Sequence, residues 1–120
     1  MDETTSLAEL KERVRRFCEA RGWDPFHNPK DLAIGISTEA AELLEHFRFR
    51  TTPECEAALA DPEERTAIAA ELADVLFFAL RFAERFGLDV SEALKAKEAV
   101  NAKRYPPSTG HGRPTPRDVG

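Results

Sequence analysis

Two apolar stretches of the sequence each carry a pair of acidic residues three positions apart. The pairs are Glu39 with Glu42 and Glu71 with Asp74. On a helix, residues at this spacing share one side, with their Cβ atoms about 5 to 6 Å apart. If the two helices pack side by side, the four carboxylates converge, and their repulsion favours protonation or a bound divalent cation. A site made of oxygen ligands alone favours a hard ion, Mg²⁺ with Mn²⁺ as an alternative.

The position of each acid on its helix decides between a solvated surface and a site. At about 100° per residue, Glu39 and Glu42 lie on one shoulder of the apolar face of their helix, whereas Glu45 points nearly opposite. Acids at this spacing are more often a solvated face. Glu71, however, lies at the edge of an unusually wide apolar face, where a carboxylate is partly desolvated, and Asp74 follows one turn later. The partly desolvated position of Glu71 therefore favours a ligand site over a solvated surface.

A di-iron carboxylate centre is a poor alternative for these acids. Such a centre uses Glu-x-x-His pairs, but His46 follows Glu42 by four residues and the helix that carries Glu71 contains no histidine. We assign no role to His46 or His111 and expect both at the surface.

Helix start and stop signals recur along the chain, and strand signals are nearly absent. They predict four substantial helices and one short piece: from the Ser6 cap to Gly22, from Pro29 to about Arg50, near residues 54–60, from Pro62 to Gly87, and from Asp89 to the Tyr105-Pro106-Pro107 stop. Short links between them indicate an all-α fold, a four-helix bundle with a short extra helix. We expect one domain over residues 1–105 and a flexible Gly/Pro-rich tail over 106–120.

Composition limits the class of protein. The 120 residues are 42% hydrophobic and 32% charged, which fits one globular domain, and the net charge of -5 argues against nucleic acid as the main partner. The sequence begins without the pattern of a signal peptide, and no apolar run approaches the roughly 20 residues of a membrane span. We therefore expect a cytoplasmic protein without a membrane partner. Cys18 and Cys55 show no metal-binding spacing and are expected to be reduced packing residues.

The stretches "STEAAELLEHFRF" and "ELADVLFFALRFAERFGLDVSEALKAKEAVNAKRYP" resemble the MazG-like all-α nucleoside triphosphate pyrophosphohydrolases, specifically the short-chain branch that includes the dCTP pyrophosphatases. The resemblance covers residues 6–107, and its E-x-x-E…E-x-x-D combination is specific. It implies hydrolysis of a nucleoside triphosphate to a monophosphate and pyrophosphate, a homodimer or homotetramer, and a role in removing excess or non-standard dNTPs. It also implies that Mg²⁺ is held by Glu39, Glu42, Glu71 and Asp74. Glu42 is our candidate for the general base as well as a ligand.

The segment "GWDPFHNPK" resembles the family's nucleotide-pocket segment, D-W-x-x-F-H-x-P-K/R. The residues that would line the base or sugar site are Trp23, Phe26 and His27. From sequence alone, aromatic residues in such a loop more often cover the hydrophobic core than contact a ligand. Phe49 falls where dCTP-specific members place a tryptophan, and Phe78 falls at another aromatic pocket position, although it fits an ordinary core position equally well. Val14 replaces a pocket histidine of the animal dCTP enzymes, which leaves the base preference open.

The last predicted helix ends with the family's K-x-x-x-N-x-x-R-Y-P pattern. The resemblance implies that the side chains of this pattern approach the phosphates or brace the metal site: Lys97, Asn101, Arg104 and Tyr105. Their spacing alone is more typical of a solvated helix. Arg104 suits a phosphate best, because its planar fork binds two oxygens. Two alternatives stay open: a non-catalytic helical oligomerisation or interaction module, and a dUTPase-like member of the same superfamily.

Overall fold

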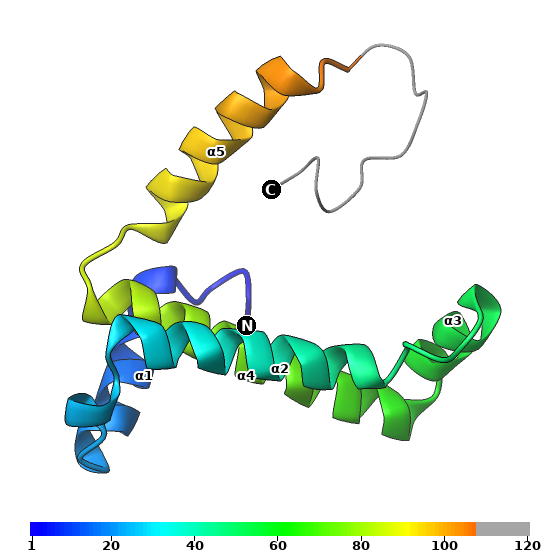
Figure 1. The fold of residues 1–120 in the computed structure, drawn as a ribbon, viewed down its shortest axis with the longest axis horizontal. Coiled ribbons are helices and arrows are strands. Elements are labelled where there is room, and N and C mark those ends of the chain that lie inside the picture. The colour runs from blue at the N-terminus through cyan, green and yellow to red at the C-terminus, as the bar shows by residue number, and fades with distance from the viewer. Residues whose placement is uncertain (108–120) are drawn as a thin grey trace. The chain divides into compact units, whose positions relative to one another are not determined.

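The computed structural model describes residues 1–107 (Figure 1). Most of the predicted tail, residues 108–120, lies outside this range, as does His111. The elements are α1 (Leu7–Ala20), the short 3-10 helix η1 (Asp24–Phe26), α2 (Pro29–Glu45), α3 (Thr52–Ala60), α4 (Pro62–Arg85) and α5 (Val90–Arg104). Residues 1–107 form helices, turns and loops and contain no strand, so the all-α prediction is confirmed.

The chain divides into two compact units. The first, Met1–Leu88, contains α1 to α4, and the second begins at Asp89 and contains α5. Within the first unit, α4 is the central element because it contacts α1, α2 and α3. A single domain over residues 1–105, with α5 as the fourth helix of a bundle, stays a prediction.

Polar side chains cap α1, α2, α4 and α5 where the sequence signals predicted, whereas α3 begins at Thr52, two residues before its predicted start. At the start of α2, the side-chain oxygen of Asn28 accepts a hydrogen bond of 2.8 Å from the Asp31 N–H. Thr51 and Glu54 form a reciprocal capping box at the start of α3. The caps of α1, α4 and α5 are Ser6, Asp61 and Asp89. Each cap satisfies an amide that has no partner within its helix, so these starts are set locally.

The end of α2 differs from the prediction. The apolar pattern continued to about Arg50, but α2 ends at Glu45 and the chain proceeds in turns. The Phe47 N–H donates to the Leu44 carbonyl at 2.9 Å, and the Arg50 N–H donates to the Phe47 carbonyl at 3.0 Å. These shorter-range bonds tighten the backbone before Thr51, which is extended (φ -72°, ψ 164°) because it caps α3. The apolar residues after Glu45 therefore belong to a loop.

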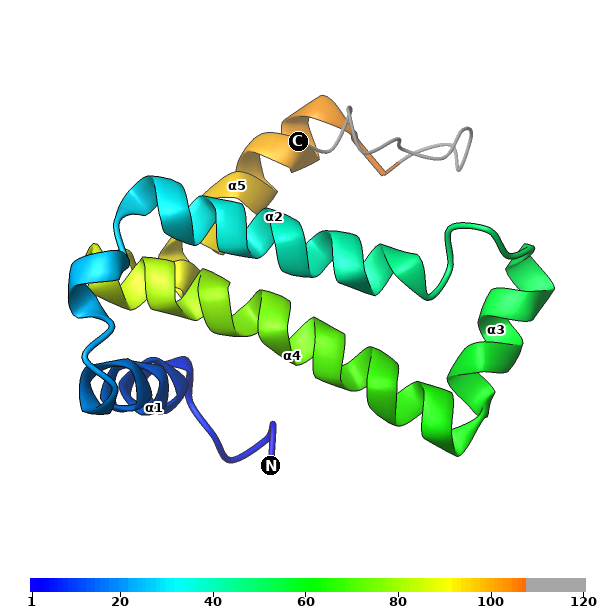
Figure 2. The same cartoon turned by 60° about the horizontal axis from the view of Figure 1, so that its bottom comes forward.

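The helices α2 and α4 run antiparallel along their lengths (Figure 2). Gly35 of α2 lies against the ring of Phe78 of α4: a Cβ atom at Gly35 would be 2.7 Å from Phe78 Cδ1. Glycine lowers helix stability by about 1 kcal/mol relative to alanine. Here it allows the two helices to approach more closely than any other residue would. The Phe78 ring also packs edge-on against Phe77, with 5.5 Å between the ring centroids.

Few side chains of the first unit are fully buried. The buried apolar residues are Cys18, Leu32, Ala58, Ile68, Leu80 and Ala83. Both cysteines are free, and Cys18 is buried and Cys55 half-buried, as packing residues should be. Large apolar side chains on α2 and α4 stay exposed, so the first unit by itself covers only part of the wide apolar face predicted for α4. Among residues 1–107, no helix is both long and apolar enough to cross a membrane.

Candidate metal centre and aromatic pocket

Three of the four predicted carboxylates meet between α2 and α4. One oxygen from each of Glu39, Glu42 and Glu71 lies within 4.8 Å of the other two, and all three residues are half-buried. The Oε2 atoms of Glu39 and Glu71 are buried without a hydrogen-bond partner in the described residues. A buried polar atom without a partner is costly. These oxygens therefore fit a divalent cation that prefers oxygen ligands.

Close approach shifts the ionisation of two of these groups. The pKa of Glu39 rises to about 7, first because its carboxyl can share a proton with Glu42, then through burial and the charges of its acidic neighbours. The pKa of Glu71 also rises, first through burial and then through the same hydrogen bonding to Glu42. Glu42 is thus a close neighbour of both other carboxyls. Such bonds require a proton because two ionised carboxylates only accept, and a divalent cation can take the proton's place.

The remaining acids of the two motifs lie differently. Asp74 is exposed and stands outside the three-carboxylate group. Its negative charge nevertheless helps to raise the pKa of both Glu39 and Glu71, so it is close to the group. Its role as a fourth ligand stays a prediction. Glu45 is exposed, as its place on the helix predicted.

A row of rings crosses from α1 to the loop before α2. Phe17 packs edge-on against Phe77, with ring centroids 5.8 Å apart, and against Trp23 at 5.6 Å. Trp23 in turn lies 5.9 Å from the imidazole of His27. Two predicted pocket residues, Trp23 and His27, are therefore neighbours, and Trp23 stays partly exposed. The row therefore consists of three aromatic side chains and one polar ring, the imidazole of His27.

One end of this row opens into a hollow of about 280 Å³. Its lining consists of Arg13, Val14, Phe17 and Phe77. Apart from Arg13, the walls are apolar, and they include the valine that departs from the family pattern. Aromatic and aliphatic walls of this kind suit a flat ring and provide few polar groups to select it.

The other predicted aromatic residues have separate environments. Phe26 in η1 is 68% exposed. Phe49, in the loop after α2, is 88% exposed, and the Arg48 guanidinium stacks over its ring at 4.8 Å. Phe78 is half-buried and contributes to helix packing through Gly35. A substrate contact for any of these three stays a prediction.

The predicted phosphate-side residues belong to the second unit. Asn101 is half-buried, whereas the other three members of the pattern are exposed: Lys97, Arg104 and Tyr105. Tyr105 follows the end of α5 as its C-cap residue. Their approach to the carboxylates stays a prediction.

Sequence reasoning overlooked Arg81. This residue of α4 is 1% exposed, and its Nε donates a hydrogen bond of 2.8 Å to Nδ1 of His27. Its other guanidinium nitrogens pair with the carboxylates of Asp24 and Glu84. The only signal in the sequence was a single cation inside the apolar run "FFALRFA", because a charged residue is rarely buried unless it is paired.

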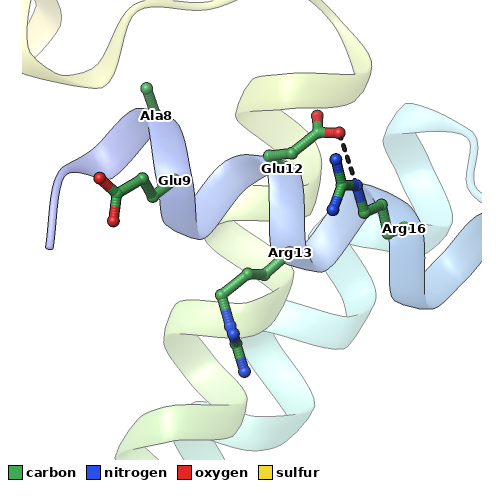
Figure 3. A pocket seen from close by; sticks show the side chains of 5 residues that line it. All are labelled: Ala8, Glu9, Glu12, Arg13 and Arg16. Carbon is green, nitrogen blue, oxygen red and sulfur yellow. Dashed lines mark hydrogen bonds and ion pairs between the residues drawn. The ribbon is translucent and has the colours of Figure 1, made fainter.

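A second open hollow, of about 460 Å³, lies on α1 (Figure 3). Its lining residues are Ala8, Glu9, Glu12, Arg13 and Arg16. Glu12 accepts a hydrogen bond of 2.9 Å from Nε of Arg16 and also pairs with Arg15. Unlike the space between α2 and α4, this hollow is lined by no buried carboxylate oxygen without a partner, and we assign it no chemistry.

The fold and site define an all-α protein in which an antiparallel helix pair brings three carboxylates together. The family model described as MazG-like matches residues 34–115, a range that includes all three carboxylates. The chain belongs to the MazG-like family.

This chain is similar to proteins of named activity and to a protein of known structure. The dCTP pyrophosphatase 1 of Homo sapiens is 33% identical over 101 residues, which are 84% of this chain and 59% of that protein. The Mus musculus protein of the same name is 31% identical over 107 residues, 89% of this chain and 63% of its own. The crystal structure of a pyrophosphatase from Archaeoglobus fulgidus superposes with a TM-score of 0.77 at 37% identity, over 82% of this chain and 91% of that one. The chain thus spans about three fifths of the curated relatives it matches.

Proposed function

We propose that this protein is a nucleotide pyrophosphohydrolase that converts (deoxy)nucleoside triphosphates to nucleoside monophosphates and pyrophosphate, with Mg²⁺ as cofactor and Mn²⁺ as an alternative. The observation that carries the proposal is the meeting of three half-buried carboxylates with two unpartnered buried oxygens. The names of the similar proteins support the reaction type.

In this proposal the three carboxylates hold the cation, with Asp74 close by. When bound, Mg²⁺ supplies positive charge to the triphosphate and lowers the pKa of a coordinated water. Glu42, a close neighbour of both Glu39 and Glu71, accepts a proton from the attacking water. Trp23 and the apolar hollow hold the base, and Lys97 and Arg104 of α5 contact the phosphates.

We further propose that pyrimidine dNTPs are preferred but weakly distinguished. Stacking on an aromatic ring contributes roughly 1 to 3 kcal/mol and is nearly independent of the base. The hollow has a valine wall and aromatic walls, which discriminate weakly. We expect dCTP to be accepted and other pyrimidine or modified dNTPs to be hydrolysed within about two orders of magnitude in kcat/KM. Such breadth suits an enzyme that removes unwanted nucleotides from the pool.

A homodimer or homotetramer is the proposed assembly. Leu44 of α2 is 56% exposed, and Leu72 and Leu76 of α4 are 58% and 47% exposed. A second copy that covered these leucines would bury apolar surface that the first unit leaves open. Light scattering should give a mass above 13.4 kDa, and Leu72→Glu should reduce it to that of the monomer. A monomeric wild-type protein at micromolar concentration would contradict the assembly.

The decisive experiment incubates the protein with Mg²⁺ and, separately, dCTP, dUTP, dTTP and 5-modified pyrimidine dNTPs, and identifies the products by ³¹P NMR. A nucleoside monophosphate and pyrophosphate are expected. Orthophosphate as the primary product would reject the reaction. Hydrolysis confined to dUTP would favour the dUTPase-like alternative. No hydrolysis, together with no effect of Mg²⁺ on thermal stability, would favour the non-catalytic module, because a groove without convergent ligands gains nothing from the ion.

A further inference from the structure

Arg81 ties the loop before α2 to α4. Its guanidinium is buried and bonds to three side chains: His27 and Asp24 in the loop, and Glu84 one turn further along α4. A guanidinium stays protonated in proteins and has only donors, so each partner must accept. The ring nitrogen that accepts is Nδ1 of His27, at 2.8 Å from Nε of Arg81.

This contact decides which form of the imidazole is present. Nδ1 cannot carry a proton while it accepts the Arg81 bond, so the proton of the neutral ring resides on Nε2. Within residues 1–107, Nε2 of His27 has no hydrogen-bond partner. We infer that Arg81 is a positioning residue: it holds His27 as a neutral imidazole whose Nε2–H is available to a hydrogen-bond acceptor on the base of a bound nucleotide.

The inference rests on the proposed function and explains one part of its selectivity. His27 stands beside Trp23 in the row of rings that leads to the apolar hollow. Cytosine, uracil and thymine all carry an acceptor, the carbonyl oxygen at C2, whereas an exocyclic amino group at C4 is a donor found only on cytosine. A histidine held as a donor binds the shared acceptor. The other tautomer would present an acceptor to the amino group and would favour cytosine.

The groups around His27 also keep the ring neutral. Burial lowers its pKa, and the positive charges of Arg81 and Arg85 lower it further, while the carboxylates of Asp24 and Glu84 oppose them. From α1, Cys18 interacts electrostatically with Arg81, Asp24 and Glu84 of this network. Because the pKa lies below its ordinary value, the neutral ring with its single N–H persists throughout the neutral pH range.

The tautomer can be measured directly by ¹⁵N NMR of the imidazole nitrogens in the whole chain. The signals of His27 are those that disappear in His27→Gln. In the wild-type protein Nε2 should be protonated and Nδ1 unprotonated. Arg81→Lys keeps the buried positive charge but loses the fixed planar donor, so a mixture of tautomers is expected. The matched control, Glu84→Gln, removes a different partner of Arg81 and should keep the wild-type tautomer. A proton on Nδ1 in the wild type, or an unchanged tautomer in Arg81→Lys, would overturn the inference.

Kinetics and nucleotide binding test the role of this donor. One neutral hydrogen bond corresponds to a change of roughly 2- to 12-fold, so Arg81→Lys and His27→Gln should each raise KM for dCTP by about this factor with little change in kcat. Glu84→Gln should keep the wild-type KM. Adding α,β-imido-dCTP with Mg²⁺ to the wild-type protein should shift the Nε2 signal of His27.

The outcomes separate this inference from the proposed function. If dCTP is hydrolysed but KM is unchanged in both variants, or the analogue does not shift Nε2, the inference fails and the function stands. If the wild type neither hydrolyses nor binds any nucleotide, the function fails and the nucleotide-reading role fails with it. The titration uses the wild-type protein, so it decides the question even if Arg81→Lys does not fold.

Discussion

Replacing Gly35 with alanine should push α2 and α4 apart at the centre of their contact. The new Cβ would meet Cδ1, Cε1 and Cγ of Phe78 at 2.7, 2.8 and 3.0 Å. Carbon atoms in contact prefer about 3.5 to 4.0 Å, so the ring or the helices must move by up to about 1 Å. Phe77 packs against the same ring at 5.5 Å between centroids, which limits how far Phe78 can rotate. We therefore expect the helices to move.

Two opposing effects set the magnitude. Alanine in a helix interior is more stable than glycine by about 0.8 to 1.0 kcal/mol. An extra methyl group in a packed interface costs about 1 to 3 kcal/mol. The free energy of unfolding should therefore fall by about 1 kcal/mol, which corresponds to a decrease in Tm of about 4 to 8 °C for a domain of this size.

The same substitution should weaken the proposed metal centre. Glu39 lies one turn after Gly35 on α2, and Glu71 faces it from α4. A wider separation of the helices increases the distance between these two ligands. The Mg²⁺ concentration needed for half-maximal dCTP hydrolysis should therefore rise. Circular dichroism of thermal unfolding in EDTA measures the stability, and a Mg²⁺ titration of product formation measures the site.

A second substitution provides the control. Phe78→Leu removes the ring atoms that the new methyl group meets, so the double variant with Gly35→Ala should be more stable than the sum of the single effects predicts. A gain in stability of about 0.8 to 1.0 kcal/mol for Gly35→Ala alone, the full value for an unhindered helix position, would refute the close approach of the two helices.

Three further predictions concern the site. Glu71→Gln should abolish Mg²⁺-dependent hydrolysis while the metal-free fold stays intact or becomes more stable, because one like charge is removed; Glu45→Gln is the control that should keep activity, and an active Glu71→Gln would reject the carboxylate site. In the metal-free folded protein the pKa of Glu39 is about 7, whereas in the unfolded chain it has its ordinary value of 4.5. The folded protein therefore binds this proton more tightly. The unfolding free energy should therefore fall as pH rises from about 4.5 to about 7. Urea unfolding in EDTA at a series of pH values should show this decrease in the wild type and a smaller decrease in Glu39→Gln. An equal decrease in both proteins would contradict the raised pKa of Glu39. Phe49→Ala should lower kcat/KM for all accepted pyrimidine dNTPs together by roughly 5- to 150-fold if the ring stacks on the base, whereas an effect on one base alone would show that another residue reads that base.

The sequence by itself determined where most helices begin and which residues share a face. Asn28 before Pro29 and Asp61 before Pro62 are caps whose hydrogen bonds reach only three residues ahead. For the same reason the spacing of Glu39 and Glu42 placed both carboxylates on one side of α2. Interactions between near neighbours decide these features, and near neighbours are visible in the sequence.

Local patterns were insufficient where the next element changed the backbone. The apolar residues after Glu45 continued the helical period, yet the chain leaves the helix because Thr51 must be extended to cap α3. A periodic pattern shows which side of a helix is apolar. It carries no information about the backbone geometry that the cap of the next helix requires.

Only the tertiary structure decided which distant groups meet. Glu71 joins Glu39 because α2 and α4 run antiparallel at a separation that Gly35 permits. The buried guanidinium of Arg81 reaches His27 across 54 positions of the chain. The spacing of residues along one helix does not specify its register against another, because that register depends on how all the facing side chains pack together.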